Sequence, residues 1–317
     1  MSANIVHQYE PELGERIAAR LPPGVKFVPL GASAGTAWTI PPEADVLLVN
    51  QNSGAVGLDR SMPAPAGWPF NLKWVHLRST GIDKYPDWIF QVPQVTVTRG
   101  GYATPIAEYV MAAVLSAAKR MPEIWARERS GWHSVKLDTL AGRTLGIVGF
   151  GEIGKAIARR ALAFDMQVLG TRRTPGPSGM DRVEIVPLEH LLQRSDHIVI
   201  ATPLTEETRG LFDDAAFAQV KPGAHLINIG RGPVIDTEAL RRALDGRLGL
   251  ATLDVTDPEP PPEGHWLYAH PQVRLSPHIS GSSPDTEAVV TGFFLENLER
   301  YRAAKPLSGL VDRRARY

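Results

Sequence analysis

Cysteine is absent from this sequence of 317 residues. Its absence excludes disulfide bonds, thiolate metal ligands and cysteine nucleophiles. No apolar run reaches the roughly 18 residues that a membrane-spanning helix needs. The first twenty residues also lack the basic segment and following apolar run that mark a signal peptide. We therefore expect a soluble, cytoplasmic protein.

An excess of charge of either sign is also missing. Lys plus Arg and Asp plus Glu both number 34, so the formal net charge is zero. Nucleic acids and anionic membranes are held by excess positive charge, and we expect neither as a partner. No spacing of His, Asp and Glu suggests a metal site. The hydrophobic fraction of 43% and charged fraction of 21% are those of a globular protein. At this length, two domains are the best expectation.

Short apolar runs rich in Val alternate with polar or helical segments along the chain. In the first hundred residues the runs typical of buried strands are Val25–Leu30, Asp45–Asn50, Lys73–Leu77 and Val95–Thr98. Pro11–Leu21 is typical of an amphipathic helix, and Gly57–Asn71, rich in Pro and Gly, of a surface loop. A second alternating series begins at Arg143. This alternation predicts an α/β fold with doubly wound parallel sheets.

The segment Thr104–Arg129 has the pattern of one long helix. It offers Thr104 as the N-cap, then Pro105 and Glu108 in or near the first turn. Its middle is almost wholly apolar, and such a helix is buried on both sides, between two domains or against a second subunit. After Ser283 the chain is again helical, and a return of that helix to the first domain would make this domain discontinuous.

A G-x-G-x-x-G spacing follows an apolar strand and opens a helix at Gly149, Gly151 and Gly154. The first glycine permits a tight turn, the second lets the backbone approach a pyrophosphate, and the third lets helix and strand pack closely. The helix N-terminus offers N–H groups to the phosphates. We predict that this turn, including Glu152 and Ile153, binds a dinucleotide; the alternative is a packing turn.

About 20 residues beyond such a turn, an acidic residue usually meets the ribose hydroxyls. Here the stretch "LGTRRTPG" has Thr171, Arg172 and Arg173 instead. Arginine binds phosphate strongly through its planar fork, whereas a carboxylate would repel a 2′-phosphate. We therefore predict a preference for NADP(H), with NAD(H) possible, and with Arg172 as the main contact. The alternative is that both arginines are solvated at a strand end.

Three later stretches place a cation, a carboxylate and an imidazole after predicted strands, where ligands bind in such sheets. They contain Arg231, Glu259 and His278. Reduction of a carbonyl beside a carboxylate creates an alkoxide that needs a proton, and His is the natural donor near neutral pH. Glu259 would hold the tautomer of His278, and Arg231 would bind the substrate carboxylate and polarise the carbonyl. Without Arg231 and Glu259 in the sequence, a histidine such as His278 would more often have a structural role.

From about Trp74 to Ser283 the sequence resembles the D-isomer-specific 2-hydroxyacid dehydrogenases. The resemblance rests on "STGID", "YATPIAEYV", "ATPLTEETRGLF", "INIGRGPVID", "LDVTDPEP" and "PHISGSS" in matching order. It implies that the backbone of Thr80 and Gly81 binds the substrate carboxylate. It also implies that Thr104, Thr202 and Pro203 lie by the cofactor, and that Asp254 bonds its carboxamide. The Glu–His pairing separates the chain from the formate dehydrogenase branch, which uses Gln.

The resemblance implies a Rossmann-like cofactor domain and a flavodoxin-like substrate domain with the site in the cleft. The substrate domain would comprise residues 1–99 and 284–317, and the cofactor domain residues 100–283. A homodimer would form around the helix 104–129. The expected activity is reduction of small 2-oxo acids, of the glyoxylate or hydroxypyruvate type, to D-2-hydroxy acids. Two alternatives are an NAD-linked enzyme that works oxidatively and a non-catalytic nucleotide sensor on the same fold.

Overall fold

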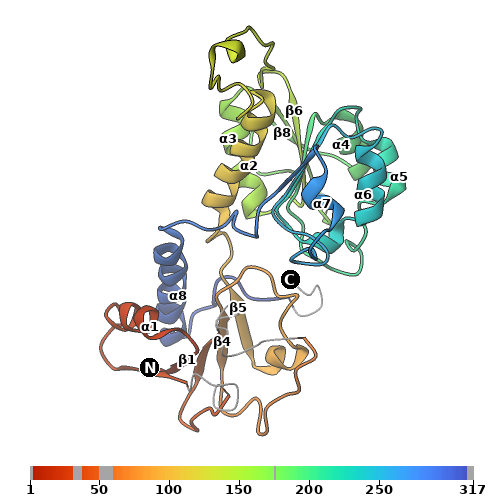
Figure 1. The fold of residues 1–317 in the computed structure, drawn as a ribbon. Helices are drawn as coiled ribbons and strands as arrows, with labels where there is room; N and C mark the ends of the chain where they lie inside the picture. The colour runs from red at the N-terminus through yellow and green to blue at the C-terminus, as the bar shows by residue number, and fades with distance from the viewer. Residues whose placement is uncertain (1–2, 31–37, 50–59, 175, 313–317) are drawn as a thin grey trace. The chain divides into compact units, whose positions relative to one another are not determined.

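The computed structural model describes residues 3–30, 38–49, 60–174 and 176–312 (Figure 1). The chain forms two compact units. Unit 1 comprises Met1–Gly101 and Pro284–Tyr317, and unit 2 comprises Tyr102–Ser283. The chain thus leaves unit 1 after Gly101 and returns to it after Ser283, two residues later than expected at the first crossing.

Unit 1 is built on a five-stranded parallel sheet with the strand order β2-β1-β3-β4-β5. Its strands are β1 (Ala3–His7), β2 (Val25–Pro29), β3 (Val46–Val49), β4 (Trp74–Leu77) and β5 (Gln94–Val97). Its helices are α1 (Pro11–Ala18), the 3₁₀ helix η1 (Asp87–Gln91) and α8 (Thr286–Arg302). The four strands predicted in this part of the sequence are present, and β1 is an additional one.

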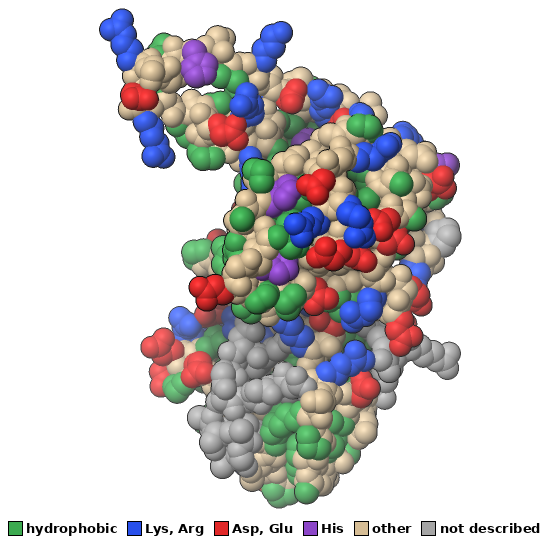
Figure 2. All heavy atoms as spheres, turned by 45° about the vertical axis from the view of Figure 1, so that its right-hand side comes forward, with side chains coloured by type: hydrophobic (Ala, Val, Ile, Leu, Met, Phe, Trp, Pro, Cys, Tyr) green, Lys and Arg blue, Asp and Glu red, His purple; other side chains and the backbone are tan. Residues whose placement is uncertain are grey.

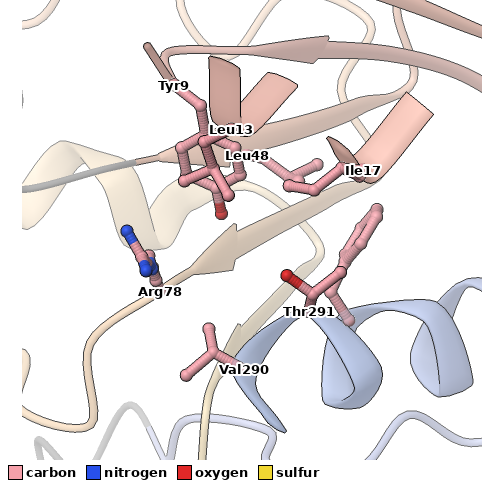
Figure 3. A pocket seen from close by; sticks show the side chains of 8 residues that line it. Tyr9, Leu13, Ile17, Leu48, Arg78, Val290 and Thr291 are labelled. Atoms are coloured by element: carbon pink, nitrogen blue, oxygen red, sulfur yellow. The ribbon is translucent and has the colours of Figure 1, made fainter. Parts of the chain in front are cut away.

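Both faces of the unit 1 sheet are covered, which explains why its strands are apolar without alternation. On β3, Val46 and Leu48 pack with residues of α1 and α8, whereas Leu47 and Val49 pack on the opposite face with η1. A hollow of about 10 Å³ remains between β3, α1 and α8, with Tyr9 and Thr291 among its lining residues (Figure 3). A space of this size holds about one water molecule.

Unit 2 is built on a seven-stranded parallel sheet with the order β12-β11-β10-β9-β6-β7-β8. Its strands are β6 (Thr144–Val148), β7 (Gln167–Thr171), β8 (Val183–Ile185), β9 (His197–Ile200), β10 (His225–Asn228), β11 (Leu250–Leu253) and β12 (Val273–Leu275). Its helices are α2 (Ala103–Ala118), α3 (Glu152–Ala163), α4 (Leu188–Arg194), α5 (Asp214–Gln219), α6 (Thr237–Leu244), α7 (Trp266–Ala269) and the 3₁₀ helices η2 (Arg129–Gly131) and η3 (Gly232–Val234). The prediction of two parallel α/β sheets is confirmed.

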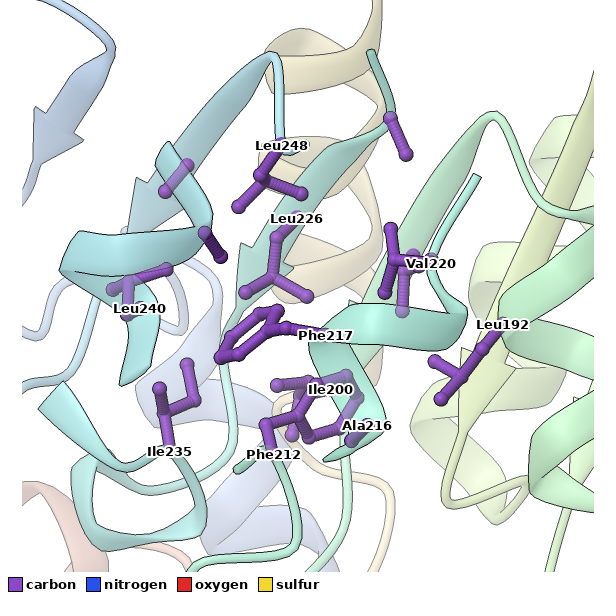
Figure 4. Close-up of a cluster of buried hydrophobic side chains, with 14 of the residues drawn as sticks. Leu192, Ile200, Phe212, Ala216, Phe217, Val220, Leu226, Ile235, Leu240 and Leu248 are labelled. Carbon is purple, nitrogen blue, oxygen red and sulfur yellow. The ribbon is translucent and has the colours of Figure 1, made fainter. Parts of the chain in front are cut away.

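Helices also cover both faces of the unit 2 sheet. Residues of α2 and α3 pack on one face with Ile147 and Val199. Residues of α4, α5 and α6 pack on the other with Ile200 and Leu226, as Figure 4 shows around Phe217. The strands are therefore rigid supports for the loops at their ends. No helix in the described part of the chain is long and apolar enough to cross a membrane.

The long helix predicted over residues 104–129 is wrong in its C-terminal half, because α2 ends at Ala118. The N–H of Met121 donates to the carbonyl of Ser116 at 2.9 Å, and Arg120 has a φ of 50°. These are features of a left-handed helix C-cap. Pro122 follows, and proline lacks an N–H and disfavours helical backbone in the residue before it.

The surface of α2 is also not apolar all round. Thr104, Glu108 and Ala112 form an exposed stripe along α2 at a spacing of four residues. Beyond α2, residues 119–139 form a projecting segment of turns, which we call the arm; it is the yellow to olive loop at the top of Figure 1.

Candidate active site

The carboxyl ends of the parallel strands of unit 2 meet at one edge of the sheet, and the predicted site residues of this unit, Thr104 apart, follow these ends. They are Gly149, Gly151, Glu152, Ile153, Gly154, Thr171, Arg172, Arg173, Thr202, Pro203, Arg231, Asp254, Glu259 and His278. The strand order reverses between β6 and β9. In open α/β sheets, ligands bind in the crevice outside such a reversal.

Each glycine of the turn after β6 occupies a position that excludes a larger residue or leaves room for a ligand. Gly149 has a φ of 96°, and a Cβ there would lie 2.7 Å from the Thr202 nitrogen. A Cβ on Gly154 would lie 3.2 Å from the carbonyl oxygen of Gly149, so α3 packs closely on the turn. At Gly151 a Cβ would meet nothing within 4 Å.

The open space at Gly151 fits a pyrophosphate, because Gly151 is the N-cap residue of α3. The first N–H groups of a helix have no partner within the helix and attract anions. Glu152 is exposed at the first helical position and pairs with Lys155, whose Nζ lies 2.8 Å from its Oε1. Ile153 is half-buried in the same turn. The residues present therefore fit the dinucleotide group that the sequence predicts.

Two further loops converge on the segment that contains Thr202 and Pro203. A Cβ on Gly230, after β10, would lie 2.8 Å from the carbonyl oxygen of Thr202. Thr208 donates its hydroxyl hydrogen to the carbonyl of Pro203 at 2.7 Å. The loops after β6, β9 and β10 are thus packed backbone against backbone, which fixes the distances between the groups that they carry.

The two arginines after β7 differ in their surroundings. The Nη2 of Arg172 donates to the carbonyl of Pro177 at 2.7 Å, and its buried Nε has no partner in the described structure. Arg173 is exposed. Thr171, half-buried, accepts the N–H groups of Gly149 and Phe150 through its carbonyl, at 3.0 and 2.9 Å. Thr171 therefore ties the arginine loop to the glycine turn.

His278 and Glu259 form a short hydrogen bond. The Nδ1 of His278 lies 2.6 Å from the Oε1 of Glu259, and the two side chains are 41% and 29% exposed. A carboxylate on Nδ1 fixes that nitrogen as the protonated one and leaves Nε2 to face a reactant. The pair predicted from sequence is thus formed within unit 2 alone.

Arg231 lies on a turn that the sequence analysis did not explain. Asn228, which is fully buried at the end of β10, accepts the N–H of Gly230 at 3.0 Å and donates to the carbonyl of Arg231 at 3.0 Å. The Nη1 of Arg231 donates to the carbonyl of Gly230 at 2.8 Å. Asn228 therefore positions the guanidinium, although in the sequence it reads only as the last polar residue of a strand.

Gly232 is a second residue that sequence analysis did not identify. A Cβ at this position would overlap the carbonyl of Thr256, at 1.9 Å. The turn of Arg231 is therefore in direct backbone contact with the loop that leads to Glu259. Thr256 also donates its hydroxyl hydrogen to the carbonyl of Pro258 at 2.8 Å, which holds this loop. The Gly232–Pro233 pair that follows Arg231 was the only sign of this turn in the sequence.

The carboxylate of Asp254 accepts hydrogen bonds from the protein itself. It is 1% exposed, and its carboxylate accepts the N–H groups of Ile279 and Ser280 at 2.9 and 3.0 Å and the hydroxyl of Ser276 at 2.6 Å. Its carbonyl accepts the N–H of His278 at 2.9 Å. In the structure Asp254 holds the loop of His278, and its contact with a cofactor carboxamide stays a prediction.

The remaining predicted residues lie elsewhere. Thr104 is exposed in the first turn of α2, and Thr80 and Gly81 belong to unit 1. The hydroxyl of Thr80 donates to the carbonyl of Thr98 at 3.0 Å, which fixes the loop after β4. Within the described residues, the N–H groups of Thr80 and Gly81 donate to no other group, so they are available to an anion.

Comparison with known proteins places the chain among nicotinamide-dependent enzymes. Residues 111–280 match the sequence model of the "D-isomer specific 2-hydroxyacid dehydrogenase, NAD binding domain". The chain is 34% identical to a glyoxylate reductase from Thermococcus gammatolerans over 232 residues, which is 69% of each chain.

Solved structures match the whole chain. A D-isomer-specific 2-hydroxyacid dehydrogenase from Xanthobacter autotrophicus, in complex with NADPH and MES, has a TM-score of 0.83 and 29% identity, with all of both chains covered. An NADPH-dependent glyoxylate/hydroxypyruvate reductase from Sinorhizobium meliloti, in complex with NADP and sulfate, has a TM-score of 0.78 and 25% identity, also with full coverage.

Proposed function

Because the chain belongs to the D-isomer-specific 2-hydroxyacid dehydrogenases, we propose that it reduces small 2-oxo acids to D-2-hydroxy acids with NADPH as the preferred cofactor. The substrates are of the glyoxylate and hydroxypyruvate type, as in the names of its relatives. The 2.6 Å contact between His278 and Glu259 carries this proposal, because a non-catalytic sensor has no use for a proton donor poised in this way.

Each residue of the site has its own role in the reaction. A bound nicotinamide supplies the hydride for the carbonyl carbon. His278 delivers a proton from Nε2 to the carbonyl oxygen, and Glu259 stabilises the protonated ring through Nδ1. Arg231 binds the carboxylate of the substrate and polarises its carbonyl. In unit 1, the N–H groups of Thr80 and Gly81 supply further bonds to that carboxylate.

The cofactor preference rests on the loop after β7. Arg172 and Arg173 stand where an acidic residue would repel a 2′-phosphate. Arg172 is held by Pro177, and among the described residues its buried Nε has no partner. A guanidinium that is already fixed loses little entropy when it binds a phosphate. The NADPH and NADP in the two structural relatives agree with this assignment.

The assembly that we propose is a homodimer built on α2 and the arm. The arm exposes large apolar side chains, with Trp132 at 86%, Trp125 at 59% and Leu137 at 43% exposure. Trp132 also lines a hollow of about 510 Å³ with Ala126, Glu128 and Arg129. In Figure 2, Lys and Arg side chains surround this projecting segment at the top of the view. A second copy of the chain would cover these tryptophans.

A panel of 2-oxo acids, assayed with NADPH and with NADH, tests the function. We expect glyoxylate or hydroxypyruvate to be reduced with a higher kcat/KM for NADPH than for NADH. Equal values with both cofactors would favour the NAD-linked oxidative enzyme. No turnover of glyoxylate, hydroxypyruvate, pyruvate or a bulkier 2-oxo acid would favour the sensor.

A further inference from the structure

A chain of side-chain hydrogen bonds connects α2 to the loop of His278. The hydroxyl of Tyr109, on α2, lies 2.6 Å from the hydroxyl of Ser276. Ser276 donates to the Oδ1 of Asp254 at 2.6 Å. A serine hydroxyl has a single hydrogen, and this one is used on the carboxylate. Tyr109 must therefore be the donor to Ser276, so all three groups are oriented in one direction.

The far end of this chain is the backbone around His278. Asp254 accepts the N–H groups of Ile279 and Ser280 through its two carboxylate oxygens. His278 has a φ of 53°, in the left-handed region that few residues other than glycine adopt. The two residues that follow this unusual backbone are thus fixed by one buried carboxylate, which also accepts the Ser276 hydroxyl.

The surroundings of Tyr109 keep its hydroxyl a donor. Burial raises the pKa of Tyr109, the Ser276 hydrogen bond lowers it by less, and the charge of Asp254 raises it further. The phenol therefore stays protonated. The N-cap residue of α2, Tyr102, contacts the loop again at Gly281, where a Cβ would lie 3.2 Å from the Tyr102 ring.

We propose that Tyr109 is a positioning residue for the reduction, acting through Ser276 and Asp254 on the left-handed loop that carries His278. This inference rests on the proposed function. Tyr109 contacts neither substrate nor the reacting atoms. Its hydroxyl orients Ser276, which in turn completes the hydrogen bonds of the Asp254 carboxylate. Loss of the hydroxyl frees Ser276 to rotate and loosens the loop, so that Nε2 of His278 is misplaced in part of the molecules.

The test is a Tyr109→Phe variant, which removes one oxygen and keeps the ring. With glyoxylate and NADPH, we expect kcat to fall roughly 10- to 100-fold, the effect of a small misplacement of a reacting group. The KM for glyoxylate and the Kd for NADPH should change less than twofold. The primary deuterium isotope effect on kcat should rise, because the transfer step becomes slower. Tyr301→Phe, in unit 1, is the matched control and should behave as wild type.

Two serine variants separate positioning from packing. Ser276→Ala interrupts the chain and should match Tyr109→Phe, whereas Ser276→Thr keeps the hydroxyl and should retain most of the activity. A wild-type kcat for Tyr109→Phe would overturn the proposal. An equal loss in Ser276→Thr and Ser276→Ala would overturn it as well, since the hydroxyl would then be irrelevant.

Hydrogen exchange gives a readout that is independent of activity. The amides of Ile279 and Ser280 should exchange faster in Tyr109→Phe than in wild type, and unchanged exchange would overturn the proposal. Wild-type protein that reduces no 2-oxo acid would instead contradict the proposed function. The exchange rates alone would then decide whether Tyr109 holds this loop.

Discussion

His278 combines an exposed ring with a constrained backbone. Its φ of 53° costs about 1 kcal/mol relative to an ordinary conformation. The hydrogen bonds that Asp254 accepts from the N–H groups of His278, Ile279 and Ser280 offset this cost. The ring itself is held by its hydrogen bond to Glu259. The backbone of His278 is therefore held by hydrogen bonds, whereas its ring is exposed, as an acid that must reach a substrate requires.

Replacement of His278 should affect the rate more than binding. We expect His278→Ala to lower kcat by about 100-fold or more, the usual contribution of a general acid, with a smaller change in the KM for glyoxylate. Glu259→Gln should lower kcat as well, because an amide stabilises a protonated ring less than a carboxylate does. Steady-state kinetics with NADPH measure both. His190→Ala, at an exposed position, is the control, and an unchanged kcat in His278→Ala would remove His278 from the mechanism.

Arg172 should discriminate between the two cofactors. Arg172→Ala should raise the KM for NADPH by roughly 10-fold or more, the effect of losing a hydrogen bond to a charged group, and should leave the KM for NADH nearly unchanged. Arg159→Ala, on the exposed side of α3, should alter neither value. If Arg172→Ala raises both KM values equally, its bond to Pro177 matters for loop structure and the cofactor preference lies elsewhere.

Among the elements, the strands of unit 2 and the glycine turn were predictable because their signals are local. The alternating series of apolar runs that begins at Arg143 predicted the second parallel sheet, and the three glycines are placed as the spacing predicted. The predicted C-terminal end of α2 was wrong because the helical pattern of apolar residues was given more weight than the helix-breaking Pro122. The roles of Asn228 and Gly232 depend on partners that lie close only after folding, so no local pattern identified them.

The tryptophans also have partners that their local sequence does not identify. Trp68 and Trp88 pack edge to face, with ring centroids 4.6 Å apart, as expected for aromatic residues by default. Trp132, by contrast, is 86% exposed. The sequence around a tryptophan does not say whether its partner is in its own chain.

The arm should determine the oligomeric state. Trp132→Glu should shift the protein from dimer to monomer at micromolar concentration, because it puts a charge into the proposed apolar contact. Light scattering coupled to size-exclusion chromatography measures the mass. Val289→Glu is the control, because Val289 is 51% exposed on α8, and it should remain dimeric. A wild-type protein that is monomeric would contradict the proposed dimer.

For the whole molecule, stability should depend on pH through buried histidines in both units. In unit 1, burial lowers the pKa of His76 to about 3. In unit 2, burial mainly lowers the pKa of His197 to about 4, and Asp196, Arg143 and Asp138 modify it. Burial, followed by His197 and Arg274, lowers the pKa of His225. These rings are neutral in the fold, and His197 and His225 face each other with their Nδ1 atoms 3.3 Å apart.

The sign of the effect follows from proton binding. Between pH 6.5 and 4 these histidines bind protons in the unfolded chain but not in the folded protein. The free energy of unfolding is therefore highest above pH 6.5 and falls as the pH decreases. At pH 5 the loss is on the order of 2 kcal/mol for each such histidine. Thermal unfolding at pH 7 and pH 5 measures it, and we expect a lower Tm at pH 5. His190→Gln, at an exposed position, should not alter this difference, and a constant Tm in wild type would refute the expectation.

The return of the chain to unit 1 sets an order of events during synthesis. Phe294 and Leu298 of α8 are 2% and 0% exposed and pack with Trp74 of β4. On the ribosome, residues 1–101 emerge first, yet the face of their sheet that α1 and α8 share is covered by α1 alone until Thr286–Arg302 has been made. Unit 2 is continuous and can finish folding earlier. The N-terminal unit is therefore completed last, and its apolar face is the surface that chaperones would have to shield in the meantime.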